Sequence, residues 1–314
     1  MSSTATALPA LTPVQRRTLD ALRRPDEDVV FDAETIEGLI ADAVASLDEL
    51  GRRLGGEQLV VTKHALDAVL GCEARFLAPD PFAWSPANAM GTVTHKAVQL
   101  WLNWRGEPAP RDVIDEALSR LADERSSIGD YVAALGSGEE AELRSRCVEL
   151  LTKFIEGFPP LDMRAHPVTE TAIRFPVDGA IVLTAKVDLV VGRPHASAAR
   201  RVIIDWKSGR IVDRHRQDLR FYALVETLCR GIPPRLLVSY SLDGCTPVVE
   251  PVSPVLLRST LLRTLDAVRL MIDLRVTDRE PTRTPGVMCR WCQLLPACPP
   301  GQASLADADI DAAG

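Results

Sequence analysis

Lysine, aromatic residues and long apolar runs are all scarce in this chain of 314 residues. Only five of its 36 basic residues are lysines, and 5% of all residues are aromatic. No stretch reaches the roughly 18 consecutive apolar residues of a membrane span, and the N-terminus lacks a signal-peptide pattern. We therefore expect a soluble, cytoplasmic protein with no membrane contact. A G-x-x-x-x-G-K-(S/T) motif is also absent from the sequence, so we expect no ATP motor within the chain.

Composition limits both the architecture and the partners of the protein. A length of 314 residues with 46% hydrophobic residues suits one large domain, or a domain with an inserted lobe. The net charge of −7 and the pI near 5.4 argue against a generally basic surface that coats nucleic acid, but they are compatible with a local basic groove. Seven cysteines in a cytoplasmic chain indicate metal or cluster ligands, or core residues, before disulfides.

Two short runs rich in Val and Ile carry the most informative residues. The first, Ile181 to Val191, is interrupted by Asp188, and the second leads directly into Asp205, Trp206 and Lys207. The runs predict neighbouring strands of a hairpin, in which Asp205 and Lys207 share one face and Trp206 points to the other. Two carboxylates and an ammonium are costly to bury together unless a divalent cation compensates them. The alternative is a cross-strand ion pair without a metal.

The residues Asp188 and Asp205-Trp206-Lys207-Ser208-Gly209 resemble the D…D-x-K-(T/S)-G core of the PD-(D/E)XK nucleases. The resemblance is to their RecB-like branch, which includes the CRISPR-associated adaptation nucleases and AddB-type subunits. It implies an α/β, restriction-endonuclease-like mixed β-sheet core flanked by helices. It also implies catalytic roles for Asp188, Asp205 and Lys207. The expected cofactor is Mg²⁺ or Mn²⁺, held by both aspartates and a main-chain carbonyl near Trp206.

A helix expected from Asn88 to Trp104 contains Gly91 and His95, which lie four residues apart and so on one face. Taken alone, a histidine on a helix is most simply incidental. The segment nevertheless resembles the G-T-x-x-H motif of the same family, which implies that His95 is a further metal ligand. The glycine one turn earlier would allow the helix to approach the strands closely.

A basic segment follows the hairpin, and we expect it to contact the DNA backbone, although such clusters are usually solvated faces. Its arginines are Arg210, Arg214, Arg216 and Arg220. Tyr222 matches the tyrosine of the family's Q-x-x-x-Y motif, which implies a nucleic-acid-binding role for it. The position one turn before this tyrosine is Asp218, whereas Gln217 is displaced by one residue, which rotates a helical side chain by about 100°. The sequence leaves open which of the two takes the glutamine's place.

Three cysteines near the C-terminus, Cys289, Cys292 and Cys298, have the close spacing of metal or cluster ligands. By spacing alone, a structural zinc site and an iron–sulfur cluster are equally compatible with them. Cys72, which alone would be a buried small hydrophobe, belongs to a segment that resembles the family's C-P-x-(R/K)-F motif, with Glu73 in place of the proline. The resemblance implies that these four cysteines hold a [4Fe–4S] cluster, with Zn²⁺ as the alternative.

We expect an N-terminal helical segment (1–58), a RecB-like nuclease domain (59–300) and a disordered acidic tail (301–314). Within the nuclease domain, 105–160 is expected to be an inserted helical lobe and 285–300 a cysteine cluster loop. Individual helices are expected from Thr12 to Arg24, from Ala33 to Arg53 and from Thr62 to Leu77.

The implied function is a metal-dependent DNA nuclease acting on single-stranded DNA or DNA ends, in repair, recombination or defence. The implied partners are DNA and a helicase or other protein. The alternative is a catalytically inactive DNA-end-binding or partner-docking module that keeps the nuclease fold and the cluster.

Overall fold

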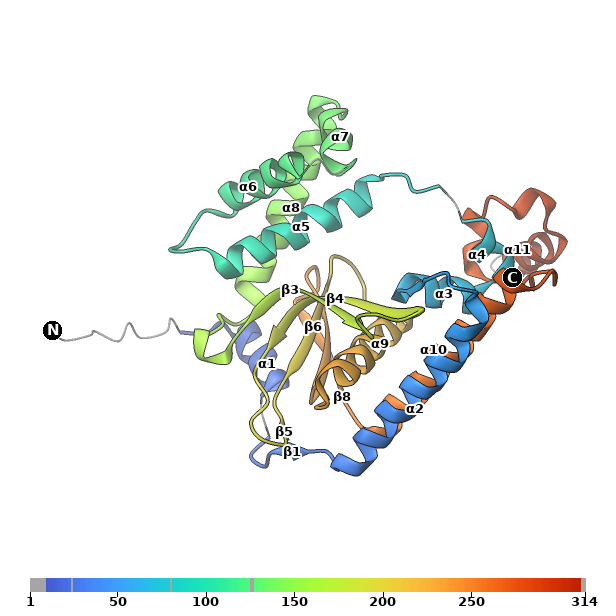
Figure 1. The fold of residues 1–314 in the computed structure, drawn as a ribbon. Helices are drawn as coiled ribbons and strands as arrows, with labels where there is room; N and C mark the ends of the chain where they lie inside the picture. The colour runs from blue at the N-terminus through green and yellow to red at the C-terminus, as the bar shows by residue number, and fades with distance from the viewer. Residues whose placement is uncertain (1–9, 24, 80, 125–126, 312–314) are drawn as a thin grey trace.

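The computed structural model of the protein describes residues 10–23, 25–79, 81–124 and 127–311 (Figure 1). Residues 1–9 of the expected N-terminal segment and 312–314 of the expected tail lie outside this description. Helix α1 (Pro13–Leu22) begins after Thr12, whose hydroxyl accepts a hydrogen bond from the Gln15 amide. Helix α2 (Ala33–Gly51) is capped in the same way by Asp32. Both helices confirm the pattern read from the sequence, because side-chain caps define helix starts locally.

The centre of the molecule is a six-stranded mixed β-sheet with the order β2-β4-β6-β7-β8, in which β3 also pairs with β4. The neighbours β4 and β6 are antiparallel, whereas β6 and β7 are parallel. The predicted hairpin between the two Val/Ile-rich runs is therefore confirmed. The strands of this sheet are β2 (Leu59–Val61), β3 (Val168–Phe175), β4 (Ile181–Val191), β6 (Val202–Lys207), β7 (Leu236–Ser241) and β8 (Thr246–Pro251). A separate two-stranded sheet joins β1 (Val29–Val30) to β5 (Ala198–Ala199).

Strand β4 has three partners, and two of them share one of its edges. Leu183 pairs with β2 and with β3, so these two strands lie on opposite sides of β4. Leu189 pairs with β3 and with β6, so β6 lies on the same side as β2 but at the other end of β4. Among the described strands, none pairs with β4 along this edge from Thr184 to Asp188. The sheet therefore opens at Asp188.

Two helical layers cover the two faces of the sheet (Figure 1). One layer packs on β4 and β6 through a core that includes Leu183, Val187 and Ile203. It consists of α2, α3 (Lys63–Gly71), α9 (Asp213–Arg230) and α10 (Pro254–Val276). The second layer packs on the other face, where Ile204 and Trp206 are buried. It consists of α5 (Pro86–Asn103), α6 (Pro110–Asp123), α7 (Ser127–Ala133) and α8 (Ser137–Gly157).

Two expectations for secondary structure were wrong. The helix expected from Thr62 to Leu77 is interrupted, because Cys72 has extended backbone angles between α3 and α4 (Glu73–Leu77). The tail expected to be disordered from residue 301 is helical to its last described residue, in α11 (Pro299–Asp311). Its acidic composition suggested disorder, but two prolines in the first turn and several alanines favour a helix. Short 3₁₀ turns complete the chain at Arg52–Leu54, Met163–Ala165, Val287–Trp291 and Leu295–Ala297.

Among the described helices, none is long and apolar enough to cross a membrane.

Candidate active site and cysteine-lined cavity

Asp188 lies where β4 and β6 separate. The last backbone pair between the two strands joins Leu189 to Ile204. Beyond this pair, the Trp206 amide donates a hydrogen bond of 2.8 Å to Oδ2 of Asp188 instead of to a backbone carbonyl of β4. The side chain of Asp188 therefore substitutes for a ladder hydrogen bond, which fixes the carboxylate at the opening of the sheet.

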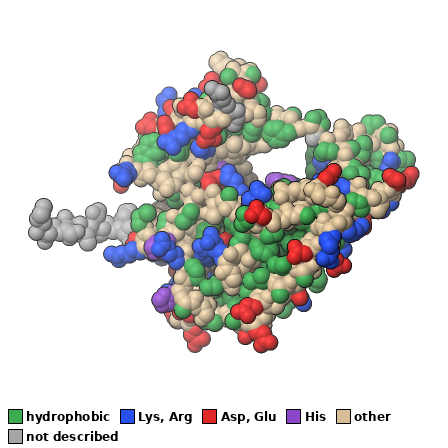
Figure 2. All heavy atoms as spheres, in the orientation of Figure 1, with side chains coloured by type: hydrophobic (Ala, Val, Ile, Leu, Met, Phe, Trp, Pro, Cys, Tyr) green, Lys and Arg blue, Asp and Glu red, His purple; other side chains and the backbone are tan. Residues whose placement is uncertain are grey.

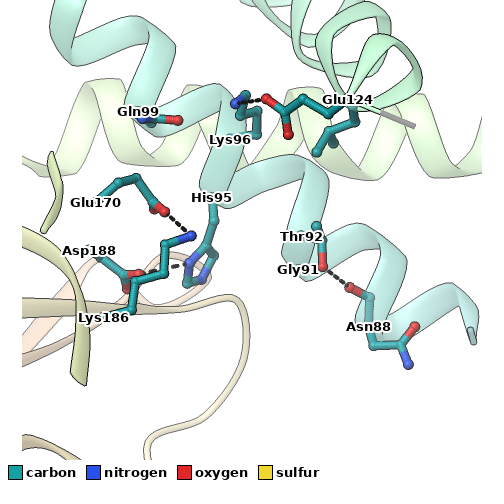
Figure 3. Close-up of a pocket in the computed structure, with 11 residues that line it drawn as sticks. Asn88, Gly91, Thr92, His95, Lys96, Gln99, Glu124, Glu170, Lys186 and Asp188 are labelled. Atoms are coloured by element: carbon teal, nitrogen blue, oxygen red, sulfur yellow. Dashed lines mark hydrogen bonds and ion pairs between the residues drawn. The ribbon is translucent and has the colours of Figure 1, made fainter. Parts of the chain in front are cut away.

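His95 reaches Asp188 from α5, on the side of the second helical layer (Figure 3). Its Nδ1 lies 3.4 Å from Oδ1 of Asp188. Burial disfavours the imidazolium, but Asp188 outweighs this effect and raises the pKa of His95. Burial likewise works against the Asp188 carboxylate, and His95 and the Trp206 amide lower its pKa. A Cβ at Gly91 would lie 3.6 Å from Oγ of Ser208, an ordinary contact, so the approach of α5 does not require glycine there.

Asp205 and Lys207 share a face of β6, as their spacing predicted, and Trp206 points to the opposite face. Asp205 is only 3% exposed, and its Oδ2 lies 2.5 Å from the ammonium of Lys207. Burial raises the pKa of Asp205, and the nearby charge of Asp188 raises it further. Trp206 makes edge-to-face contacts with Phe158 and Tyr240, with ring centroids 5.0 and 5.8 Å apart. This aromatic cluster fixes the direction of the strand that carries the two charged residues.

Two further charged residues lie at this centre, and one of them, Lys63, was missed from the sequence. The ammonium of Lys63, on α3, lies 3.2 Å from Oδ2 of Asp218. The same Asp218 oxygen lies 4.0 Å from the ammonium of Lys207. The scarcity of lysine could have drawn attention to Lys63, since it is one of only five in the chain. Asp218 is buried, so it and not Gln217 points from α9 toward the centre.

Tyr222, which was predicted to contact DNA, is buried in the structure. The side chain is only 3% exposed, and the Lys63 ammonium lies 5.2 Å from the centroid of its ring. Burial raises the pKa of the Tyr222 phenol to about 12. The ring therefore has no surface to stack on a base, and it supports Lys63 instead.

Of the four arginines predicted to form one backbone-binding patch, Arg210 precedes α9, and the other three are divided between two faces of this helix. Residues two positions apart on a helix point about 200° apart, so Arg214 lies on the face of Asp218 and away from Arg216. Arg216 and Arg220 both bind the carboxylate of Glu250 on β8, at 2.7 Å and 2.9 Å. The remaining two, Arg210 and Arg214, are exposed. Glu250 therefore partly neutralises one half of the expected basic patch.

A polar cavity of about 420 Å³ adjoins His95 and Asp188 (Figure 3). It lies between α5 and the strands β3 and β4, and the ion pair of Lys186 with Glu170 lies at its side. The ion pair of Lys96 with Glu124, at 2.6 Å, lines it from the helical layer. Figure 2 shows the hollow between the α5–α8 helices and the rest of the molecule, with basic and histidine side chains at its edge. The cavity gives a ligand access to one side of the Asp188 carboxylate.

Comparison with known proteins identifies the family. The model of the PD-(D/E)XK nuclease superfamily matches residues 62–299. The chain belongs to this superfamily. No curated protein matches the chain. A crystal structure of a protein from Eubacterium rectale, provisionally named an exonuclease, has 11% sequence identity and a TM-score of 0.45 over 72% of this chain and 84% of that chain. The mixed α/β architecture agrees with that of a PD-(D/E)XK nuclease.

Members of the PD-(D/E)XK superfamily generally use Mg²⁺ or Mn²⁺, so we compared the site with the needs of such an ion. The donors fit in type, because the site contains two carboxylates and an imidazole, and Oδ2 of Asp205 accepts no regular hydrogen bond. However, within the described residues, no three His, Cys, Asp or Glu side chains are placed to hold a metal ion. Each acid is instead paired with a basic side chain, Asp188 with His95 and Asp205 with Lys207.

The four cysteines of this PD-(D/E)XK protein that were predicted to bind a cluster line one cavity of about 220 Å³. They are Cys72, Cys289, Cys292 and Cys298, and all four are half-buried free thiols. A Cβ at Gly301 would lie 3.3 Å from Sγ of Cys298 and 3.5 Å from Sγ of Cys289, so the absence of a side chain there leaves the thiols room. Among the described residues, these thiols likewise form no group that could hold a metal ion as they stand.

Glu73 explains how the Cys72 segment meets the C-terminal loop without the family's proline. Its carboxylate accepts hydrogen bonds of 2.7 and 2.9 Å from Arg279 and one of 2.7 Å from the Thr282 amide. The hydrogen bond from Arg279 is the main cause that lowers the pKa of Glu73, to about 2. The Thr282 carbonyl in turn accepts a hydrogen bond from the Ala74 amide. These hydrogen bonds join residues 73–74 directly to residues 279–282, without the help of a metal ion or cluster.

Proposed function

We propose that this PD-(D/E)XK protein is a metal-dependent deoxyribonuclease that hydrolyses phosphodiester bonds. The observation that carries the proposal is the meeting of Asp188, Asp205 and Lys207 at the opening between β4 and β6. Two neighbouring acids are unfavourable, and the carboxylate of Asp205 is nearly inaccessible to water. Such an arrangement serves a cation-binding reaction centre better than it serves stability.

We assign the cation to Asp188, Asp205, His95 and a main-chain carbonyl near Trp206. A bound Mg²⁺ or Mn²⁺ supplies a water of lowered pKa and neutralises charge on the phosphate. Lys207 would orient the attacking water and offset the negative charge that develops on the phosphate oxygens. A cation held by Oδ2 of Asp205 would compete with the ammonium of Lys207, which lies 2.5 Å from this oxygen.

The experiment that tests this function is a cleavage assay on end-labelled and circular DNA, single- and double-stranded, with Mg²⁺ or Mn²⁺. Cleavage should require the cation and be lost, by about a thousandfold or more, in Asp205→Asn and Lys207→Met. The matched control is Lys153→Met, which removes a lysine paired with Asp243 on the surface. Cation-independent activity, or full activity in Asp205→Asn, contradicts the proposal. DNA binding without any cleavage would favour the inactive end-binding module.

For the substrate, we propose single-stranded DNA or DNA ends, in repair, recombination or defence. The support is the site's position beside a cavity of about 420 Å³, bounded on one side by α5 and on the other by β3 and β4. A single strand is more easily accommodated in such a space than a duplex. Circular single-stranded DNA in the assay separates cleavage at ends from internal cleavage, because a circle resists an end-dependent enzyme.

We also propose that the four cysteines hold a [4Fe–4S] cluster. The support is that one cavity is lined by Cys72 from the N-terminal half and by three cysteines of the C-terminal loop. Thiolates suit both iron–sulfur clusters and zinc, so metal content decides between them. Protein purified without oxygen should be brown and contain iron and sulfide, both of which Cys72→Ser should reduce. A colourless protein with one zinc per chain overturns the cluster and leaves the nuclease proposal intact.

A further inference from the structure

Lys63 lies at the proposed catalytic centre, but the proposed mechanism needs no direct contact from it to the cation or the phosphate. It begins α3, after the Thr62 hydroxyl has capped the helix by accepting a hydrogen bond from the Ala65 amide. Its side chain is 17% exposed, and its ammonium is 3.2 Å from Oδ2 of Asp218. The Tyr222 ring lies beneath it, with the centroid 5.2 Å from the ammonium. The ammonium is therefore held on two sides by α9.

The charges at the centre require such a partner. Asp188 and Asp205 already place two carboxylates at the opening of the sheet, and Asp218 adds a third that is only 8% exposed. A buried carboxylate without a compensating cation is strongly unfavourable. Lys63 supplies that cation, so the Lys63–Asp218 pair contributes no net charge to the centre.

Asp218 also lies within reach of Lys207. The Lys207 ammonium is 2.5 Å from Asp205 and 4.0 Å from Asp218. A small rotation of this long side chain would exchange one carboxylate for the other. Lys63 neutralises part of the charge of Asp218. The less of this charge is neutralised, the more strongly Asp218 attracts Lys207 away from Asp205.

We propose that Lys63 is a positioning residue of the catalytic centre, which neutralises Asp218 and thereby fixes the place of Lys207 and the charge at Asp205. This inference rests on the proposed metal-dependent nuclease function. Removing Lys63 makes the surroundings of Asp205 more negative, whereas removing Asp218 makes them more positive, so the two changes should have opposite effects.

In Lys63→Met, the uncompensated Asp218 adds negative charge and draws Lys207 away from Asp205. Mn²⁺ should then bind more tightly, by roughly tenfold, because a competing ammonium has left Asp205. DNA cleavage should nevertheless fall at saturating Mn²⁺, since Lys207 is no longer beside the reacting phosphate.

In Asp218→Asn, Lys63 loses its partner, and its positive charge, which already acts on Asp205, is no longer offset by Asp218. Mn²⁺ should bind more weakly, again by roughly tenfold, and cleavage should recover in part at high Mn²⁺ concentration. In the double variant Lys63→Met/Asp218→Asn, both charges are gone. Its Mn²⁺ affinity should return to within about threefold of the wild type.

The test measures the Mn²⁺ affinity of each full-length variant by isothermal titration calorimetry without DNA. Cleavage assays at saturating Mn²⁺ follow. Thermal unfolding shows that each variant is folded, and the double variant is the one best protected from a buried unpaired charge. The surface pair of Lys153 and Asp243 provides matched controls, Lys153→Met and Asp243→Asn, which should change neither affinity nor cleavage.

Opposite shifts in Mn²⁺ affinity that cancel in the double variant support the inference, since a purely structural role would weaken binding in both single variants. Equal-sign shifts, or no shifts, overturn it. If wild-type protein binds Mn²⁺ and cleaves DNA while the Lys63 and Asp218 variants match it, only this inference fails. If wild-type protein binds no Mn²⁺, the proposed function fails together with it.

Discussion

Replacing Asp205 by asparagine is expected to stabilise the cation-free protein while removing its response to Mn²⁺. Burial and the neighbouring Asp188 raise the pKa of Asp205, so the folded protein binds this proton more tightly than the unfolded chain does. Stability is therefore lost as pH rises above the unfolded pKa, and at neutral pH the ionised carboxylate is a net cost. A neutral isostere should add on the order of 1 kcal/mol to the free energy of unfolding.

The cation reverses this balance in the wild type. At a Mn²⁺ concentration 100 times the Kd, binding adds about 2.7 kcal/mol to the free energy of unfolding. For a chain of this length, that corresponds to a rise in Tm of about 4 °C. Asp205→Asn should show no such rise, because one of the two acidic ligands has lost its charge.

The assay is thermal unfolding at pH 7 of both proteins, first with EDTA and then across a Mn²⁺ titration. The control is Asp243→Asn, which removes a surface acid paired with Lys153. A Tm in EDTA several degrees below that of the wild type would show that Asp205 serves the fold, and would refute the reasoning. A Mn²⁺-dependent rise preserved in Asp205→Asn would show that Asp205 is no ligand.

Three further substitutions test other parts of the molecule. Glu250→Gln should release two arginines of α9, so that single-stranded DNA binds more tightly in EDTA. The slope of log K against log salt concentration should steepen by about 0.7 per new phosphate contact. A slope unchanged from the wild type, as expected for the surface control Glu149→Gln, contradicts this. Glu73→Gln weakens the bonds to Arg279 and should lower the free energy of unfolding by about 1–2 kcal/mol in chemical denaturation, whereas an unchanged midpoint means that the contact does not stabilise the fold. Gly301→Val should crowd the two nearest thiols and lower the iron content per chain, and wild-type iron content would show that the thiols are arranged differently.

Local sequence signals predicted much of the centre of this protein. The alternation of Asp205, Trp206 and Lys207 gave the correct faces because side chains on a strand alternate regardless of what surrounds them. The residues of the hairpin are close in sequence, so their pairing could also be inferred. The contact of His95 with Asp188 crosses from a helix to a strand, and only the family resemblance suggested it.

The ion pair of Lys63 with Asp218 could not be predicted in this way. The two residues belong to α3 and α9, and only the packing of both helices on the sheet brings them within 3.2 Å. The neutralisation of Arg216 by Glu250 likewise depends on where β8 ends up beside α9. Such pairings between distant segments leave no periodic pattern in the sequence, so a basic cluster looks free when it is not.

The two oxygens of Asp188 have separate duties, and this affects how the residue should be mutated. Oδ2 completes the β-ladder by accepting the Trp206 amide, whereas Oδ1 faces the imidazole of His95. Alanine would remove both and leave a buried amide unsatisfied, which should lower the free energy of unfolding by about 1–3 kcal/mol. Asparagine can still accept from Trp206, so its unfolding midpoint should stay near that of the wild type while Mn²⁺ binding is lost. Equal stability of the two variants in chemical denaturation would mean that the sheet opening closes without this carboxylate.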